Sequence, residues 1–587
     1  MNKIDVANYS IGDIFSKFYV VPDYQREYVW EEKNYRQLLE DIIEEFSNNR
    51  NSEYFIGSIV VCEREDDKRY EVIDGQQRLT TLFACLAAFK KLLEQVQDVS
   101  DVKQMLYAMS RDSSGKQEYN FKLELQYEES TDVIKKMAED KVNQEWTVPS
   151  SKRIVEAYNF SKEYIYKELG SEVSAFLGYF LNNVKLVQIE TPKVSDALKI
   201  FETINERGVG LNPMDLLKNL IFRQVNKGEF EKLKVEWKKV ISTLEKAEEK
   251  PLRFLRYFIM ANYKVNNPPL DEIIREDEIY NWITKPGNVK QCNYEKQPFE
   301  FVKFMLANAE SYVAFLKGQN KQGNRSENFE NIKRLGGGGF RQHLILMLAA
   351  KDMSNELLNH LAQQIEALMF YYFVTKEPTK EFERKFSKWA KSLKTIKTKE
   401  ELNNFILGTI TPEITLREDA FKRYFLSLNS DVFQVYRLRY ILARLTEYVD
   451  RSYLGSKEQK DLSNYIVKGI EIEHILPFNP EKELREAFKE DYDQYKIKLG
   501  NLTLLEKPMN IVAGNDFFQN KQSIYKNSMF YLTRSLSSFA IVGMNTSISR
   551  INSQLKEYKK WDKKSIDSRQ ELLYNLAKNI WKVEVLP

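Results

Sequence analysis

The sequence predicts an α+β protein that is predominantly helical. Short β-branched runs and alternating apolar segments fall in the first 220 residues, as strands would. After about Lys218 the apolar residues recur mainly at helical spacing. A chain of 587 residues also exceeds what one hydrophobic core accommodates. We therefore expect an α/β domain over 1–220, a helical domain over 221–400 and a largely helical domain over 401–587.

The first domain contains three predicted strands and two predicted helices. Phe55–Cys62 is apolar and β-branched, and Arg69–Ile73 alternates before Asp74-Gly75 ends it. A helix should begin near Gln76 or Gln77, because Leu79, Leu82, Phe83, Leu86 and Phe89 follow at helical spacing. Val184–Ile189 is another strand candidate. Ala197–Ile204 reads as a helix that ends near Arg207-Gly208.

The middle of the chain shows helical periodicity and a run of four glycines. Trp237, Ile241 and Leu244 keep the helical period. Gly336–Gly339 is predicted to join two helices, since no Lys-Ser or Lys-Thr pair follows it as in a phosphate loop. The last segment is predicted to start helical near Glu401 and to end helical at Leu572–Trp581.

The amino-acid composition limits the class of protein but does not identify its function. The net charge is +3, from 88 basic and 85 acidic residues, which neither shows nor excludes nucleic-acid binding. No apolar run approaches the roughly 20 residues needed to cross a bilayer. Three cysteines give no disulfide framework, and the N-terminus lacks the pattern of a signal peptide. We expect a cytoplasmic protein with no membrane partner.

The C-terminal part carries the residue set of a one-metal nuclease. Glu473 precedes His474, one of only three histidines, and Asn501 and Asn510 follow at a nine-residue step. A histidine at a strand end can activate water, while a neighbouring carboxylate and a helix residue hold one divalent ion. Magnesium keeps several waters and needs few protein ligands. His474 is thus the predicted base, Glu473 and Asn510 the metal ligands, and Asn501 the support.

These residues resemble an HNH (His-Me finger) nuclease of the H-N-N variety. The resemblance implies a ββα-metal finger, in which Asn510 as the last ligand favours Mg²⁺ or Mn²⁺. The carboxylate is Glu473, where aspartate is commoner in the family. Lys521 continues the pattern downstream and is expected to contact a phosphate. The alternative is a structural His474 with asparagines in turns. A cluster of lysines nearby fits either a DNA-backbone contact or a solvated helix face: Lys559, Lys560, Lys563 and Lys564.

A second set of polar residues lies at the predicted strand-to-helix junction after Ile73. Backbone N–H groups at a helix start attract anions, Gly75 permits close approach, and Arg78 can pair with a phosphate. Asp74 suits a magnesium ion or a ribose hydroxyl. The alternative for Asp74-Gly75 is an ordinary strand-ending turn.

Four patches in order resemble the N-terminal domain of the GmrSD-type Type IV restriction endonucleases. They are Val21–Trp30, Phe55–Ser58, Ile73–Thr81 and Phe201–Lys218. The resemblance implies a ParB/sulfiredoxin-like fold that hydrolyses a nucleotide. It implies a nucleotide site made of Gln25, Arg26, Asp74, Gly75, Gln77 and Arg78, with Asn205 and Arg207 nearby.

Together the two resemblances imply a nucleotide-regulated, divalent-metal-dependent DNA endonuclease. It would use GTP or ATP and restrict foreign, modified DNA such as that of phages. Two alternatives stay open at this point: an abortive-infection nuclease acting on host DNA or RNA, and a nucleotide-dependent DNA sensor with one vestigial site. The sequence leaves a homodimer open and does not name the DNA modification.

Overall fold

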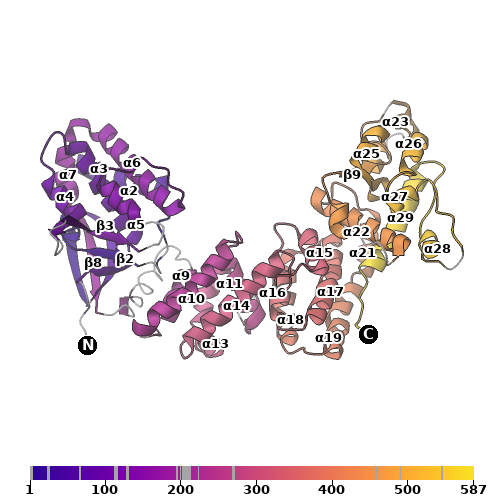
Figure 1. The fold of residues 1–587 in the computed structure, drawn as a ribbon, viewed down its shortest axis with the longest axis horizontal. Helices are drawn as coiled ribbons and strands as arrows, with labels where there is room; N and C mark the ends of the chain where they lie inside the picture. The colour runs from indigo at the N-terminus through magenta and orange to yellow at the C-terminus, as the bar shows by residue number, and fades with distance from the viewer. Residues whose placement is uncertain are drawn as a thin grey trace. The chain divides into compact units, whose positions relative to one another are not determined.

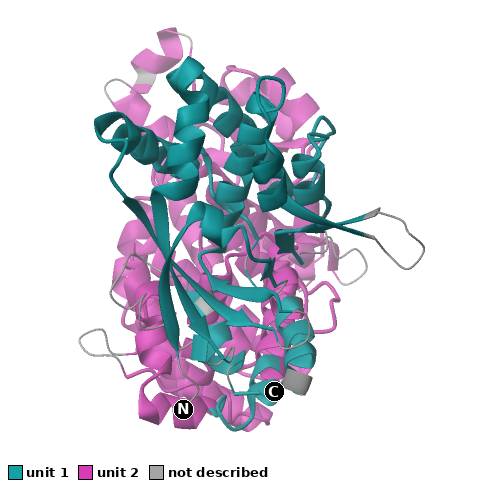
Figure 2. Ribbon diagram, turned by 90° about the vertical axis from the view of Figure 1, so that its left-hand side faces the viewer, with its two compact units in different colours: residues 1–238, 293–302 teal, residues 239–292, 303–587 magenta. Residues whose placement is uncertain are grey.

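A computed structural model shows a mostly helical α+β protein, as predicted (Figure 1). It describes residues 4–22, 25, 27–64, 68–111, 117–126, 131–192, 196–197, 200, 213–222, 224–225, 227–266, 272–455, 461–480, 482–488, 491–543 and 546–587. These form two compact units, residues 1–238 with 293–302 and residues 239–292 with 303–587 (Figure 2). The division into 1–220, 221–400 and 401–587 stays a prediction.

The first unit contains a mixed six-stranded sheet in the order β1-β8-β3-β4-β2-β7. Its strands are β1 (Asp5–Ser10), β2 (Tyr19–Val21), β3 (Tyr54–Glu63), β4 (Tyr70–Asp74), β7 (Leu123–Leu125) and β8 (Val184–Thr191). β3 and β4 form an antiparallel pair, and β8 runs parallel to β3. β2 is parallel to both β4 and β7, whereas β1 is antiparallel to β8. A separate antiparallel pair joins β5 (Tyr107–Arg111) and β6 (Gln117–Phe121).

The helices of this unit include the predicted one after Asp74-Gly75. They are α1 (Ile11–Ile14), α2 (Glu32–Asn48), α3 (Gln76–Leu93), α4 (Ser100–Leu106), α5 (Thr131–Ala138), α6 (Pro149–Leu169), α7 (Val173–Asn182) and α9 (Pro213–Phe222). The strands predicted over 55–62, 69–73 and 184–189 correspond to β3, β4 and β8. The helix predicted over 197–204 lies mostly outside the described residues.

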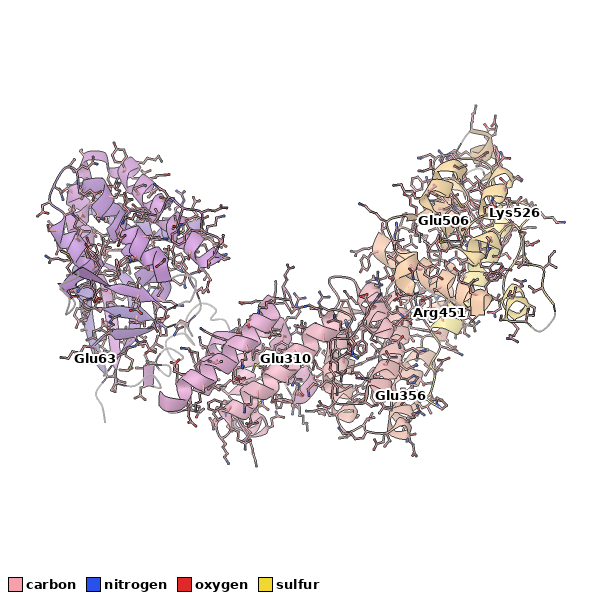
Figure 3. All side chains as sticks on the ribbon, viewed as in Figure 1. Glu63, Glu310, Glu356, Arg451, Glu506 and Lys526 are labelled. Carbon is pink, nitrogen blue, oxygen red and sulfur yellow. The ribbon has the colours of Figure 1, made fainter. Side chains whose placement is uncertain are left out.

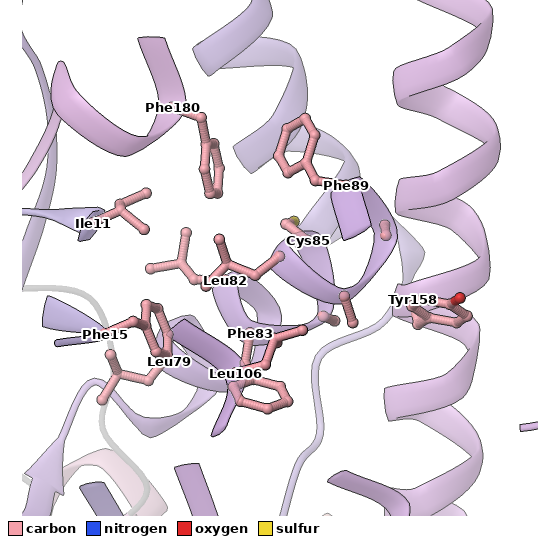
Figure 4. Packing of buried hydrophobic residues seen from close by; sticks show 14 of the residues in the cluster. Ile11, Phe15, Leu79, Leu82, Phe83, Cys85, Phe89, Leu106, Tyr158 and Phe180 are labelled. Atoms are coloured by element: carbon pink, nitrogen blue, oxygen red, sulfur yellow. The ribbon is translucent and has the colours of Figure 1, made fainter. Parts of the chain in front are cut away.

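Helix α3 is the centre of the first hydrophobic core. Its Leu79, Leu82, Phe83 and Phe89 are fully buried (Figure 4). Burial of each such side chain contributes about 1.5–3 kcal/mol, so α3 is fixed firmly against its neighbours. This rigidity holds the strand-to-helix junction at Gly75 in place. Tyr28 is buried in the same core.

The second unit is built mainly from helices. After α10 (Lys227–Glu245) come α11 (Pro251–Asn262), α12 (Ile279–Ile283), α13 (Pro286–Cys292), α14 (Pro298–Leu316), α15 (Glu327–Gly336), α16 (His343–Ala349), α17 (Asn355–Val374), α18 (Thr379–Leu393), α19 (Lys399–Phe405), α20 (Thr411–Thr415), α21 (Glu418–Leu426) and α22 (Val435–Leu454). The glycine run joins α15 to α16, as predicted. Gly337 has φ +64°, and a Cβ there would lie 2.4 Å from the Tyr436 ring, so this turn requires glycine.

The C-terminal part of this unit contains one strand pair among short helices. Its elements are β9 (Ile470–His474), α23 (Lys482–Phe488), α24 (Tyr492–Lys496), β10 (Leu502–Glu506), α25 (Lys507–Ala513), α26 (Phe518–Tyr525), α27 (Tyr531–Arg534), α28 (Ser547–Asn552) and α29 (Lys563–Ile580). The predicted terminal helix corresponds to α29. Across the described residues we find no helix with the length and apolarity needed to span a membrane.

Two of the three histidines are buried among the helices of the second unit. His343 begins α16, and burial together with Arg341 lowers its pKa to about 3. His360 in α17 is hydrogen-bonded through Nε2 to the Glu584 carbonyl at 3.0 Å. The third histidine, His474, has a different setting at the end of β9.

Candidate active site

An antiparallel hairpin followed by a helix positions the C-terminal candidate residues. β9 pairs with β10 so that His474 lies opposite Leu502 and Glu473 opposite Thr503. Leu502, Leu504 and Leu505 are buried and hold β10 in the core. Glu506, labelled in Figure 3, ends β10 and accepts a hydrogen bond from the Ser528 hydroxyl at 2.8 Å. α25 follows at once and carries Asn510.

The imidazole of His474 is neutral in this setting. It is the last residue of β9, and its ring meets that of Phe478 edge to face with centroids 5.4 Å apart. Burial lowers the pKa of His474 to about 4, and the positive charges of Lys521 and Lys496 act in the same direction. The imidazole therefore keeps a free lone pair at pH 7 and can accept a proton.

Asn501 fixes the chain directly after His474. Its side chain is fully buried. Oδ1 accepts from the Leu476 N–H at 2.6 Å and from the Trp561 Nε1–H at 2.9 Å. Nδ2 donates to the Leu476 carbonyl at 2.9 Å and to the Lys496 carbonyl at 2.8 Å. A fully satisfied buried amide of this kind rigidifies its surroundings, so Asn501 holds the backbone around Leu476.

Glu473 lies beside Lys521 in the interior. Its Oε1 accepts from Lys521 Nζ at 2.8 Å and from the Tyr525 hydroxyl at 2.7 Å. Burial raises the pKa of Glu473, while the Lys521 charge opposes the shift. Lys521, expected to contact a phosphate, is fully buried and also donates to the His474 carbonyl at 3.0 Å. In this structure its ammonium therefore binds the end of β9.

Asn510 contacts a carboxylate that the sequence pattern did not single out. Its Nδ2 donates to Glu471 Oε2 at 2.7 Å, whereas its Oδ1 is buried without a hydrogen-bond partner. Glu471 is also 3.7 Å from Lys507 Nζ. One signal was available: residues i and i+2 of a strand share a face, so Glu471 and Glu473 lie on the same side of β9.

The side-chain oxygens of Glu473 and Asn510 suit a small divalent cation that prefers oxygen ligands and needs few of them from the protein. An amide oxygen that is buried and unpaired is costly unless something binds it. No group of three or more His, Cys, Asp or Glu within the described ranges could hold a metal, so a zinc-type cage is not found there. Two oxygen ligands with water in the remaining positions match the preference of Mg²⁺.

The first unit places Arg78 over a glycine of the neighbouring strand. Gly57 has φ +107°, and a Cβ there would lie 3.0 Å from Arg78 Nη2. Arg78 Nη1 donates to the Ser58 carbonyl at 2.9 Å. Burial lowers the pKa of Arg78, and the charge of Asp74 at the end of β4 opposes that shift. The guanidinium thus sits partly buried between β3 and α3.

The other candidates for the nucleotide site hold the same junction together. Gly75 precedes α3 with φ +89°, and a Cβ there would come within 2.5 Å of Ile59. Gln77 Oε1 accepts from the Val29 N–H at 2.8 Å, and its Nε2 donates to the Glu27 carbonyl at 3.0 Å. Gln25 Nε2 donates to the Ile73 carbonyl at 3.1 Å. Gln77 and Gln25 therefore tie the segment around 25–30 to the junction.

Three further candidates cannot be placed. Arg26, Asn205 and Arg207 lie outside the described residues. The structure thus brings Gln25, Asp74, Gly75, Gln77 and Arg78 to one junction in the first unit. It brings Glu473, His474, Asn501, Asn510 and Lys521 to the hairpin of the second.

Comparison with known protein families finds one match in the N-terminal part of the chain and another in the C-terminal part. Residues 8–222 match the GmrSD restriction endonuclease N-terminal domain, and residues 415–576 match the GmrSD restriction endonucleases C-terminal domain. An uncharacterized protein of Methanocaldococcus jannaschii is 24% identical over 267 residues, a match that covers 38% of this chain and 42% of that protein. The two matched regions contain the two candidate sites, one each. With both domains of the family present in order, the chain belongs to the GmrSD restriction endonucleases.

Proposed function

We propose that this protein is a nucleotide-regulated, divalent-metal-dependent endonuclease that cleaves foreign, modified DNA such as that of phages. Family membership supports DNA cleavage as the reaction. The observation that carries the proposal is the hairpin itself: a neutral His474 stands at the end of β9, and α25 presents a buried, unpaired Asn510 oxygen. These are the base and the ligand that hydrolysis of a phosphodiester requires.

His474 is the proposed general base in an HNH-type site. Its imidazole nitrogen takes a proton from water as the water oxygen bonds to phosphorus. One P–O ester bond breaks, and the leaving oxygen takes up a proton from solvent. Asn501 keeps His474 in place by binding both backbone groups of Leu476. Lys521 also holds His474 in place, by donating a hydrogen bond to the His474 carbonyl.

Asn510 and Glu473 are the proposed ligands of Mg²⁺ or Mn²⁺. The metal ion supplies Lewis-acid stabilisation of the charge that develops at phosphorus and on the leaving oxygen. Each ligand has a polar neighbour that orients it. Glu471 accepts from Asn510 Nδ2, which directs Oδ1 away from Glu471. Lys521 and Tyr525 both bind Oε1 of Glu473, and neither of these two bonds uses Oε2.

Removing the Glu471 carboxylate should weaken metal binding although Glu471 is not itself a proposed ligand. In Glu471→Ala the Asn510 amide loses the acceptor that sets its orientation. Loss of such an orienting partner typically lowers metal affinity about 10–100-fold. Titration of Mn²⁺ followed by electron paramagnetic resonance measures the affinity without any cleavage. The exposed Glu571 on α29 provides a matched control as Glu571→Ala. Equal Mn²⁺ affinity in Glu471→Ala and wild type would show that Glu471 does not orient Asn510 for metal binding.

The first unit is the proposed site for GTP or ATP. A partly buried guanidinium next to glycine backbone can pair with a phosphate. Arg78 and Gly57 have this relation, and Gly75 opens α3 beside them. Gln77 and Gln25 keep the junction rigid. We propose that nucleotide hydrolysis in this unit controls the nuclease. Such control requires structural elements that switch between two arrangements and that both sites influence.

Arg78→Ala should remove the nucleotide effect and leave the nuclease itself intact. Wild-type cleavage of modified DNA is expected to change when GTP or ATP is added, whereas the variant should cleave at the same rate with and without nucleotide. Single-turnover cleavage rates with each nucleotide provide the measurement. Arg50→Ala is the control, because Arg50 is an exposed residue of the same unit that pairs with Glu172. If nucleotide alters wild type and Arg78→Ala equally, the proposed coupling through Arg78 is wrong.

A further inference from the structure

A cavity of about 800 Å³ in the second unit has five cationic side chains among its 14 lining residues. It lies beside the turn at Gly337 and Gly338 and is bounded by α15 and α22. Its five cations are Lys317, Lys333, Arg334, Arg341 and Arg439. Glu330 is the one carboxylate in the described lining, and it is shared by Lys333 at 3.7 Å and Arg334 at 3.3 Å. The cavity therefore has a large excess of positive charge.

The guanidinium of Arg341 is poorly satisfied by the protein. Its Nε is buried without a hydrogen-bond partner, and Glu249 Oε2 is 3.5 Å away. Its Nη1 makes only long hydrogen bonds, to the Gly337 carbonyl at 3.3 Å and the Phe340 carbonyl at 3.4 Å. Buried donors without partners are uncommon in folded proteins. An anion in the cavity would offer Nη1 a stronger acceptor than these two long hydrogen bonds provide.

One wall of the cavity is joined directly to the nuclease hairpin. Arg439 on α22 donates from Nη1 to the carbonyl of Ile470, the first residue of β9, at 2.6 Å. Tyr436, one turn away on the same helix, is half-exposed and packs against Gly337. A ligand that moves Arg439 would therefore act on the strand that carries His474.

We propose that this cavity is a binding site for phosphate groups, separate from the hairpin and from the Arg78 junction. Five Lys and Arg side chains around a volume of this size fit several linked phosphates better than a single carboxylate, and guanidinium groups bind phosphate bidentately. The phosphates can come from the backbone of bound DNA or from a free nucleotide. The DNA source rests on the proposed function, whereas phosphate binding as such does not.

The test uses the full chain with Arg78→Ala, so that the proposed nucleotide site in the first unit does not contribute. Lys317 and Lys333 are exposed, and replacing both by glutamine removes two of the five positive charges of the cavity with little effect on folding. Lys388→Gln with Lys391→Gln on α18 is the matched control, since both lysines are exposed in the same unit and lie outside the cavity. Calorimetry measures the affinity for inorganic tripolyphosphate. We expect at least 10-fold weaker binding for the cavity variant, Lys317→Gln with Lys333→Gln, and unchanged binding for the control.

Two further arms identify the source of the phosphates. With His474→Ala added to prevent cleavage, duplex DNA binding is measured against salt. If the source is DNA, the slope of log K against log[salt] should fall by about 0.9 for each lost phosphate contact, or about 2 in all. If the source is a nucleotide, GTP or ATP affinity falls and the DNA slope stays the same. Unchanged binding of tripolyphosphate, nucleotide and DNA would overturn the proposal. A third outcome separates the two proposals. If the wild type cleaves no DNA but the cavity variant still loses tripolyphosphate binding, the phosphate site is supported and the proposed nuclease function is contradicted.

Discussion

His474→Ala is expected to lower the rate of DNA cleavage by about 10²–10⁴-fold, the range typical of a lost general base. The reason is local, because burial and the nearby charges of Lys521 and Lys496 keep the imidazole neutral and able to take a proton. Since the pKa of His474 is lowered to about 4, the base form persists below pH 6.5. Protonation of His474 should therefore reduce wild-type cleavage only as the pH falls toward about 4.

Single-turnover rates on one DNA substrate measure the His474 effect, and DNA binding is measured beside them. Binding should be retained, because the imidazole acts on water. Added imidazole should restore part of the rate to the variant by occupying the vacated position. His360→Gln is the control, as His360 lies on α17 and binds the Glu584 carbonyl. Wild-type cleavage by His474→Ala would exclude His474 as the base.

Lys521→Met should destabilise the end of β9 by about 3–5 kcal/mol, the usual result of removing one partner from a buried ion pair. The Glu473 carboxylate would be left in the interior with the Tyr525 hydroxyl but without its cation. The His474 carbonyl would also lose its bond from Lys521 Nζ. We expect β9 amides to lose protection in hydrogen exchange, because this method reports local opening in a protein of several domains.

A double variant separates charge from packing in the Lys521 experiment. Replacing a whole buried ion pair by apolar side chains of similar volume is often neutral for stability. Lys521→Met combined with Glu473→Met should therefore recover much of the β9 protection lost in the single variant. It should still fail to cleave DNA, since Glu473 is a proposed metal ligand. Wild-type protection in Lys521→Met alone would show that the pair does not hold the strand.

The local fold of both sites could be read from the sequence with useful accuracy. Apolar periodicity located β3, β4 and the start of α3, because these elements form one face of a core and their side chains must repeat with the period of the backbone. The resemblance to HNH nucleases implied that Asn501 supports a hairpin and that Asn510 lies on a helix, and the structure has Asn501 directly before β10 and Asn510 on α25. Such features are local, so a window of residues contains the information.

Partners of the site residues were not accessible in the same way. Lys521 was expected to contact a phosphate, and its burial against Glu473, which the sequence did not indicate, depends on the packing of α26 on β9. Glu471 gave no separate signal because charged side chains are mostly exposed, and its bond to Asn510 forms only when α25 folds back. The cationic cavity joins side chains from α15 and α22, far apart in the sequence. Long-range packing decides all three.

Metal-dependent cleavage by the full chain tests the central claim most directly. Wild type and Asn510→Ala are incubated with modified DNA across a range of Mg²⁺ concentrations, with a chelator-treated sample of each. We expect wild type to cleave with Mg²⁺ and to stop after chelation, and Asn510→Ala to need a higher Mg²⁺ concentration for half-maximal cleavage. Cleavage that continues in chelator, or an equal Mg²⁺ requirement in both proteins, would contradict a metal-dependent nuclease centred on His474 and Asn510.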